Sequence, residues 1–250
     1  MDVKNVQDYF DSDGVVDDYA KAAVELGLWA SEEKIFTRLF APDDSLLELG
    51  CGAGRIAIGL YELGYRNLLA TDYARNMVGK TRDLVKRLDY TIHSRVADAT
   101  QLDFEDAIFD GAIFGFNGLM QIPKSAQRER ALSEVFRVLR PGAWFAFTTH
   151  DRDCSTHRDF WKAETVRWEY GTEKPEHEDF GDRTEPTDHG MHFMHVPTVG
   201  EMQLLLSKVG YHIEVSFMRS EMGKESAEVE AFSDDCRFWI VKKPEVSAKS

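Results

Sequence analysis

The chain's 250 residues accommodate one α/β domain with a modest insertion, and 16 Phe, 8 Tyr and 5 Trp within a 43% apolar composition supply a sizeable core. Asp and Glu outnumber Lys and Arg by 44 to 30, a formal charge of −14, which repels polyphosphate and argues against a nucleic-acid partner. No apolar stretch approaches the roughly 20 residues that span a bilayer, so we expect no membrane partner. The acidic N-terminus has no apolar signal core, and Cys51, Cys154 and Cys236 form no CxxC pair, which predicts a cytoplasmic location without disulfides or a zinc site.

Apolar residues recur at helical spacing from 15 to 40, which predicts a helical leader. From 45 to 150, short apolar runs alternate with helical stretches. We predict strands at 45–49, 68–72, 94–97, 111–116 and 144–149, and helices at 55–63, 76–88 and 125–139. This alternation is typical of βαβ units, which build a parallel sheet with right-handed crossovers.

The alternation ends at residue 150. Residues 151–195 are aromatic and acidic, and we interpret them as an insertion that covers one end of the sheet. A helix is predicted at 197–209 and strands at 211–217 and 237–241, within a C-terminal part that runs from 196 to 243. The two closing strands lack a full helix between them, which indicates an antiparallel hairpin at the sheet edge. The predicted fold is a single doubly wound, Rossmann-like domain with a seven-stranded, mostly parallel sheet.

A glycine-rich loop joins the first predicted strand to its helix, in the segment Glu48-Leu-Gly-Cys-Gly-Ala-Gly-Arg55. Glycines there allow a sharp turn and a close approach of the backbone to a ligand. Asp72 ends the next predicted strand, 22 residues after Gly50, where a carboxylate can accept both hydroxyls of a ribose. The pair predicts a nucleotide site.

Arg55 stands where the dinucleotide fingerprint requires its third glycine, which disfavours a nicotinamide dehydrogenase. Glu48, two residues before the first glycine, suits a cationic amino-acid group better than a pyrophosphate. The loop resembles the first motif of the class I S-adenosylmethionine-dependent methyltransferases. The likeness extends over 46–147 and, more weakly, 197–241, through segments similar to the family's later motifs: TDYARNM, VADA, the Phe-Asp before the fourth strand, and RVLRPG.

The resemblance implies a role for each matching position. S-adenosylmethionine would be the cofactor, with its methionine part held at Gly50, Cys51 and Gly52 and its ammonium near Glu48. Asp72 would bind the ribose. The resemblance also assigns side chains around the adenine and the sulfonium: Tyr73, Met77, Asp98 and Ala99 for adenine, and Phe116 and Asn117 for the methionine and sulfonium region. Arg55 would pair either with the cofactor carboxylate or with a surface acid.

The acceptor is less well defined. The segment after the fourth strand, Phe116-Asn117-Gly118-Leu119, lacks the Asn/Asp-Pro-Pro-Tyr/Phe motif of nucleic-acid amino methylation, which favours a small-molecule acceptor. His150 is expected where the fifth strand ends, as a general base or as a loop-bonding side chain. We expect the insertion and the 15–40 leader to form an acceptor-binding cover, with Trp29, Trp161, Trp168 and His192 as candidate residues. Trp161 and Trp168 share one helical face, which is also typical of core residues. His189, His192 and His195 recur every third residue, but on a strand His192 faces away from the other two, and we expect no metal.

Two further interpretations remain open at this stage. One is a catalytically silent S-adenosylmethionine-binding regulatory module, and the other is the disfavoured dehydrogenase. The favoured interpretation is an enzyme that transfers a methyl group in line to a small molecule. The methylated atom and the oligomeric state are not predicted.

Overall fold

A computed structural model of the chain describes residues 3–245. Its central sheet has seven strands in the order β3-β2-β1-β4-β5-β9-β8. Their bounds are β1 Leu46–Leu49, β2 Leu68–Asp72, β3 His93–Val96, β4 Phe109–Phe114, β5 Leu139–Thr149, β8 His212–Met218 and β9 Arg237–Lys242. The first five strands pair in parallel and β9 runs antiparallel to both of its neighbours, which confirms the predicted sheet and its terminal hairpin.

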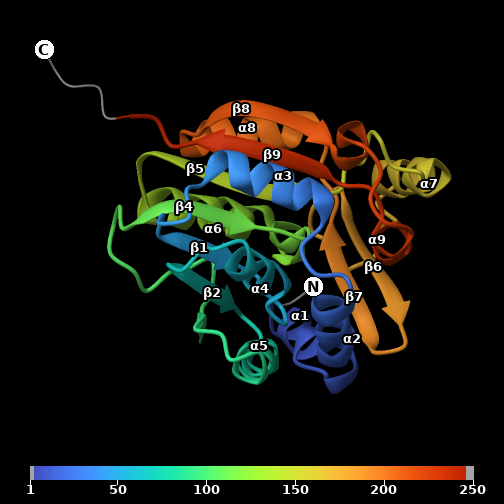
Figure 1. Cartoon of the computed structure of the whole chain (residues 1–250). Helices are drawn as coiled ribbons and strands as arrows, with labels where there is room; N and C mark the ends of the chain where they lie inside the picture. The colour runs from blue at the N-terminus through green and yellow to red at the C-terminus, as the bar shows by residue number, and fades with distance from the viewer. Residues whose placement is uncertain (1–2, 246–250) are drawn as a thin grey trace, which may run out of the picture.

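Helices cover both faces of this sheet (Figure 1). On one face, α3 (Ala30–Leu39), α4 (Arg55–Glu62) and α5 (Arg75–Arg87) pack over a core that includes Phe36 and Ile113. On the other face, α6 (Ser125–Val138) and α8 (Val199–Val209) pack over a core that includes Leu132 and Phe147. Both faces are buried, which is why the strands are continuous apolar runs rather than alternating ones.

The predicted leader holds two helices that are separated near Gly27, and a third helix precedes them. An additional helix, α1 (Val3–Phe10), precedes α2 (Asp13–Glu25) and α3, and it lies outside the predicted 15–40 range. The spacing of Val3, Val6 and Phe10 on one helical face carries the signal for α1. The strand β5 is also longer than predicted, because it starts at Leu139 and includes the Pro-Gly turn.

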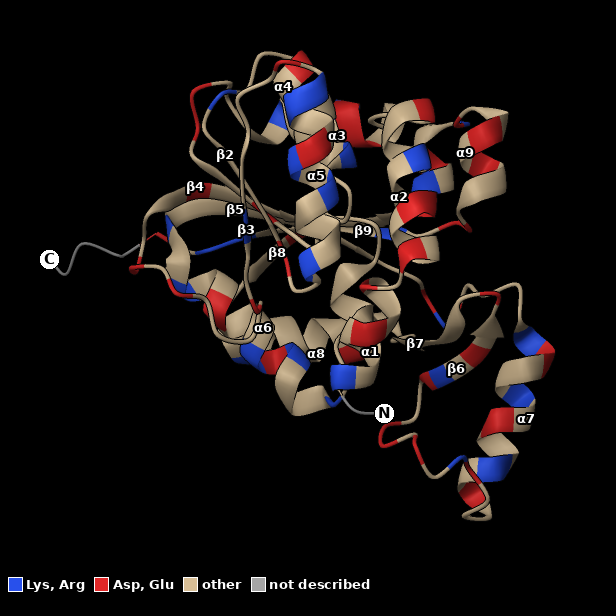
Figure 2. Cartoon of the chain, turned by 90° about the horizontal axis from the view of Figure 1, so that it is seen from below, with Lys and Arg blue, Asp and Glu red and all other residues tan. Residues whose placement is uncertain are grey.

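The insertion forms a small unit of its own. It holds α7 (Arg158–Glu169) and a two-stranded antiparallel sheet, β6 (Asp182–Thr187) and β7 (Gly190–His195). Seen from below, β7 lies toward α1, and α7 lies at the outer edge (Figure 2). Short segments complete the chain: η1 (Gly118–Gln121), η2 (Arg219–Met222) and α9 (Ala227–Phe232). No helix in the described range 3–245 is long and apolar enough to cross a membrane.

Candidate cofactor site

The order of the strands in the central sheet determines where the candidate cofactor site lies. Connections from β1 lead to one side of the sheet and those from β4 to the other, so a crevice opens at the carboxyl ends of these neighbouring strands. The glycine-rich loop lies there, and Gly50, Gly52 and Gly54 have φ of +60°, +54° and +90°. A Cβ at Gly50 would lie 2.8 Å from the Phe114 ring, and one at Gly52 would lie 2.9 Å from the Tyr19 ring. Glycine is therefore needed both for the turn and for the space it leaves.

Asp72 braces this loop from the tip of β2. Its Oδ2 accepts from the Gly52 amide and its Oδ1 from the Ala74 amide, both at 2.8 Å. Burial raises the pKa of Asp72 to about 6, although these two backbone amides oppose the shift. Asp72 also lines the cavity, and a carboxylate there can accept from the hydroxyls of a ribose.

Glu48 is a buried carboxyl with an unsatisfied oxygen. Its side chain is 5% exposed, and Oε2 has no hydrogen-bond partner among the described residues. Burial raises the pKa of Glu48 to about 8 against the opposing charge of Arg55. A buried acceptor without a donor is costly, and a cationic ligand beside it would remove that cost.

A cavity of about 400 Å³ connects these groups. All but one of the predicted cofactor residues line it, and the described structure brings together Glu48, Gly50, Cys51, Gly52, Arg55, Asp72, Tyr73, Met77, Asp98, Ala99 and Phe116 there. Asp98 is held by the loop that follows β3, because its Oδ1 accepts from the Thr100 amide and hydroxyl at 2.8 and 2.7 Å.

Asn117 is the one predicted cofactor residue that does not line the cavity. Phe116 and Asn117 both have positive φ, +48° and +60°, which is uncommon for residues other than glycine. The resulting turn sends Phe116 into the cavity wall and Asn117 away from it, so that Asn117 Nδ2 lies 3.4 Å from His150 Nε2. Asn117 is therefore not brought together with the other predicted cofactor residues, and its place beside the sulfonium stays a prediction.

Arg55 has a partner that the sequence did not indicate. Its Nη1 and Nη2 donate to the two carboxylate oxygens of Glu32 at 2.6 and 2.7 Å, and Glu32 is 2% exposed. The guanidinium also lies 4.3 Å from the centre of the Trp29 ring. The acid that Arg55 binds is thus buried rather than on the surface, while Arg55 also lines the cavity and its contact with the cofactor carboxylate stays a prediction.

The cover of the cavity differs from the predicted one. Lining residues come from α1, α2, α9 and the start of α6, and in the described chain none comes from 151–195. Val3, Val6, Gln7, Phe10 and Phe232 were therefore missed. The amphipathic spacing of α1 was a usable signal, whereas nothing in the local sequence marked Phe232.

The predicted acceptor residues lie behind the wall rather than in it. Trp29 is buried and its ring contacts Phe116 edge to face, with centroids 5.6 Å apart. His192 Nε2 lies 3.0 Å from Oε1 of the lining residue Gln121, and its ring stacks on Tyr9 at 5.2 Å. The hairpin thus supports α1 from outside the cavity.

Trp161 and Trp168 belong to the core of the insertion. Trp161 packs with Met120, Met194 and Val196, and the Trp168 ring lies 6.0 Å from that of Phe180. Neither tryptophan lines the main cavity, although Trp161 lines the smaller hollow that also holds His150, and their part in acceptor binding stays a prediction.

His150 lies in a smaller neighbouring hollow with Asp151, Cys154 and Asp235. Its Nδ1 is 3.0 Å from the Asp235 carbonyl oxygen, and burial lowers the pKa of the imidazole. Because His150 does not line the main cavity, its predicted contact with the acceptor is not made there.

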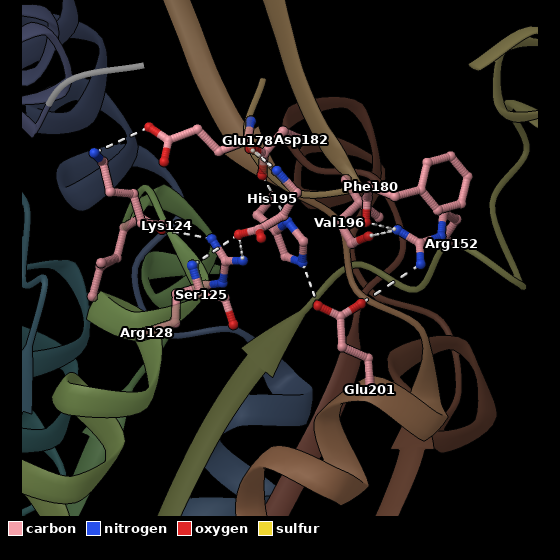
Figure 3. A network of polar contacts seen from close by, with 12 residues as sticks. Lys124, Ser125, Arg128, Arg152, Glu178, Phe180, Asp182, His195, Val196 and Glu201 are labelled. Carbon is pink, nitrogen blue, oxygen red and sulfur yellow. Dashed lines mark hydrogen bonds and ion pairs between the residues drawn. The ribbon is translucent and has the colours of Figure 1, made fainter. Parts of the chain in front are cut away.

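His195 links the insertion to the main body through a polar network (Figure 3). Its Nδ1 lies 2.8 Å from Asp182 Oδ1, and its Nε2 lies 2.6 Å from Glu201 Oε1. Asp179, whose carboxylate lies near Asp182 and His195, accepts from Arg128 and from the Ser125 amide at 2.8 Å. The groups of this cluster are held by protein partners, which accounts for the cluster without a metal ion.

Comparison with known proteins agrees with this geometry. Residues 46–142 match the family described as "Methyltransferase domain". The matched segment, which is less than half of the chain, is therefore similar to methyltransferase domains. The remaining elements complete the fold around it.

Two curated relatives match over part of their length. A demethylmenaquinone methyltransferase of Leptospira interrogans is 33% identical over 104 residues, which are 40% of this chain and 40% of that protein. The ubiquinone/menaquinone biosynthesis C-methyltransferase UbiE of Brucella anthropi is 35% identical over 108 residues, 42% of this chain and 40% of that protein. The matches thus span less than half of either relative.

The whole fold has solved counterparts. A structure titled as a SAM-dependent methyltransferase from Methanosarcina mazei superposes with a TM-score of 0.68 at 21% identity, over 85% of this chain and 98% of that one. The fold therefore extends well beyond the matched segment. The residues of the cavity also fit S-adenosylmethionine, because the unsatisfied Glu48 carboxyl suits an ammonium group and Asp72 has acceptor positions for a ribose.

Proposed function

We propose that the protein transfers the methyl group of S-adenosylmethionine directly to a small-molecule acceptor. The observation that carries this proposal is the unsatisfied Glu48 carboxyl in a cavity that also holds Asp72 and Asp98. In the family that the loop resembles, acids at these three positions bind the amino-acid group, the ribose and the adenine of the cofactor. The cofactor supplies an activated methyl group, so the protein contributes chiefly alignment, which is worth about 7–11 kcal/mol in favourable cases.

The cover supports a small acceptor. Gln7 of α1 donates to the Tyr73 carbonyl oxygen at 3.2 Å, and Asp11 accepts from the Asn76 amide at 2.7 Å, so α1 is fastened across the rim beside Asp72. An acidic chain with net charge −14 disfavours a nucleic acid. The names of the two curated relatives refer to demethylmenaquinone and to ubiquinone/menaquinone biosynthesis, which indicates small-molecule acceptors for those proteins. We therefore propose that α1, α2 and Phe232 form the acceptor cover, with the 151–195 insertion as its support.

Three free thiols support a reducing, cytoplasmic location as part of the same proposal. Cys51 and Cys236 are buried and Cys154 is exposed, and all three are unpaired. An exposed thiol persists most readily in a reducing compartment.

The test is methyl transfer into a metabolite extract. The protein is incubated with S-adenosylmethionine that carries a labelled methyl group, and labelled products are separated and identified by mass spectrometry. We expect a labelled small molecule with the wild-type protein, and loss of labelling with Asp72→Ala. Leu204→Ala is the matched control, because Leu204 is 74% exposed on α8 and away from the cavity. Binding of the cofactor without any labelled product would favour a silent module instead.

A further inference from the structure

One end of the cavity is aromatic. Four rings from four separate elements line it: Phe10 of α1, Tyr19 of α2, Phe116 after β4 and Phe232 of α9. Successive ring centroids lie 6.0 Å apart for Phe10 and Tyr19, 5.8 Å for Tyr19 and Phe116, and 5.4 Å for the stacked pair of Phe116 and Phe232. Rings at these distances form a continuous wall that suits a flat apolar ligand.

This aromatic end lacks a proton acceptor strong enough to act as a base. Among the described lining residues, the carboxylates are those of Glu48, Asp72 and Asp98, which the proposed function places on the cofactor, and no imidazole is present. The lining also includes the amides of Gln7 and Gln121, the hydroxyl of Tyr19, and Arg55, whose guanidinium lies 5.9 Å from the centre of the Phe116 ring. Burial raises the pKa of the Tyr19 phenol well above its ordinary value, so this group donates a hydrogen bond rather than accepting a proton.

A buried positive charge, that of Arg219, lies behind the aromatic wall. Arg55 and Glu32 neutralise each other, but Arg219, which lies 4.9 Å from the centre of the Trp29 ring, donates to the Ser233 carbonyl oxygen and forms no ion pair within residues 3–245. Arg219 is itself 5% exposed. A buried unneutralised cation opposes a cationic acceptor nearby and favours one that becomes anionic.

We propose that Phe10, Tyr19, Phe116 and Phe232 bind a phenol whose hydroxyl ionises without a base from the protein. This inference rests on the proposed function and adds the class of acceptor. The phenol releases its proton to solvent, and the phenolate oxygen then forms a bond to the methyl carbon. The carbon–sulfur bond breaks and its electron pair stays on sulfur, so the products are a methyl ether and the neutral thioether.

A series of phenols of graded acidity tests the absence of a base. Transfer to phenol, 4-chlorophenol and 4-nitrophenol is measured as kcat/KM against pH, and the products are identified by mass spectrometry. We expect methyl ethers, and an inflection in each profile that moves with the acidity of the phenol used. A single inflection shared by all three phenols would identify a base in the protein and overturn the inference. Methylation of ring carbon, or preferential transfer to benzylamine, would also overturn it.

Phe232→Leu tests the aromatic wall. Phe232 is 37% exposed, so the variant is expected to fold, and the lost ring contact should raise KM for 4-chlorophenol about tenfold. The affinity for S-adenosylhomocysteine should stay within about twofold, as it should in the Leu204→Ala control. An unchanged KM, or an equal loss of cofactor affinity, would contradict the aromatic acceptor site. Wild-type protein that binds no S-adenosylhomocysteine would instead overturn the proposed function.

Discussion

Arg55 and Glu32 form a two-point ion pair in the interior, with N–O distances of 2.6 and 2.7 Å. The pair joins the first turn of α4, directly after the glycine-rich loop, to the first turn of α3 in the leader. Glu32 also accepts from the Trp29 amide at 3.0 Å. The leader is therefore fixed to the loop that shapes the cofactor site, and Trp29 is fixed with it behind Phe116.

Glu32→Ala should destabilise the protein by about 3–5 kcal/mol, because it leaves the Arg55 charge buried without its partner. Chemical denaturation measures this loss. Glu33→Ala is the control, since Glu33 is exposed on the same turn and its carboxylate forms no described ion pair. Equal stability of the two variants would contradict a structural role for the pair.

Glu48→Gln should change how stability depends on pH. The folded-state pKa of Glu48 is raised to about 8, above the ordinary value of 4.5, so the folded protein retains a proton that the unfolded chain releases. Wild-type stability contributed by this group is thus present at low pH and is lost as the pH rises from about 4.5 to 8. Without cofactor, the variant should match the wild type near pH 4.5 and exceed it at pH 8.5 by a margin on the order of 3 kcal/mol. A constant difference in melting temperature across this range would count against the buried carboxyl.

His195→Ala should loosen the insertion without affecting a metal. The variant removes contacts to Asp182 and Glu201, at a cost of about 2–4 kcal/mol. His189→Ala is the matched control, because its partner Asp18 is largely exposed and the pair contributes about 1 kcal/mol or less. We expect no change in the melting temperature of the wild type with chelator, and a large decrease would indicate a bound ion instead.

His150→Ala should leave cofactor affinity within about twofold, because His150 lies outside the cavity. Turnover should fall by less than about tenfold, whereas a general base contributes about 10²–10⁴. Calorimetry with S-adenosylhomocysteine and the labelled-transfer assay provide the two measurements. A loss in turnover of a hundredfold or more would restore His150 as a base.

The local pattern of apolar residues was sufficient to predict strands of the central sheet. Runs such as Leu46–Leu49 and Leu68–Asp72 are bounded by turns and are buried on both faces, so their hydrophobicity alone marked them as strands. The Glu48–Arg55 loop and Asp72 were recognisable because the turn constrains residue type over a short segment. In these places local and tertiary preferences agree.

The partners across the fold were not predictable in the same way. The contact between Arg55 and Glu32 spans 23 residues, and the stacking of Phe116 on Phe232 spans more than a hundred. His150 directly follows β5, as predicted, but local sequence did not show that it would lie outside the cavity. The side chain of Asn117 lies outside it too, because the positive φ of Phe116 and Asn117 turns the chain after β4, which residue types other than glycine do not indicate. The packing of Trp161 against Met120, Met194 and Val196 also depends on contacts across the fold.

The central claim is that this cavity binds S-adenosylmethionine with its ammonium beside Glu48, and the most direct test is calorimetry of S-adenosylhomocysteine binding at pH 7. Free Glu48, with a pKa of about 8, is mostly protonated at that pH, and an ammonium beside it would lower the pKa. Binding measured in buffers of different ionisation enthalpy should therefore show one ligand per chain and the release of close to one proton. The proton release should be absent in Glu48→Gln. The protein should not bind NAD. No binding of S-adenosylhomocysteine, or binding that releases the same number of protons in Glu48→Gln, would contradict it.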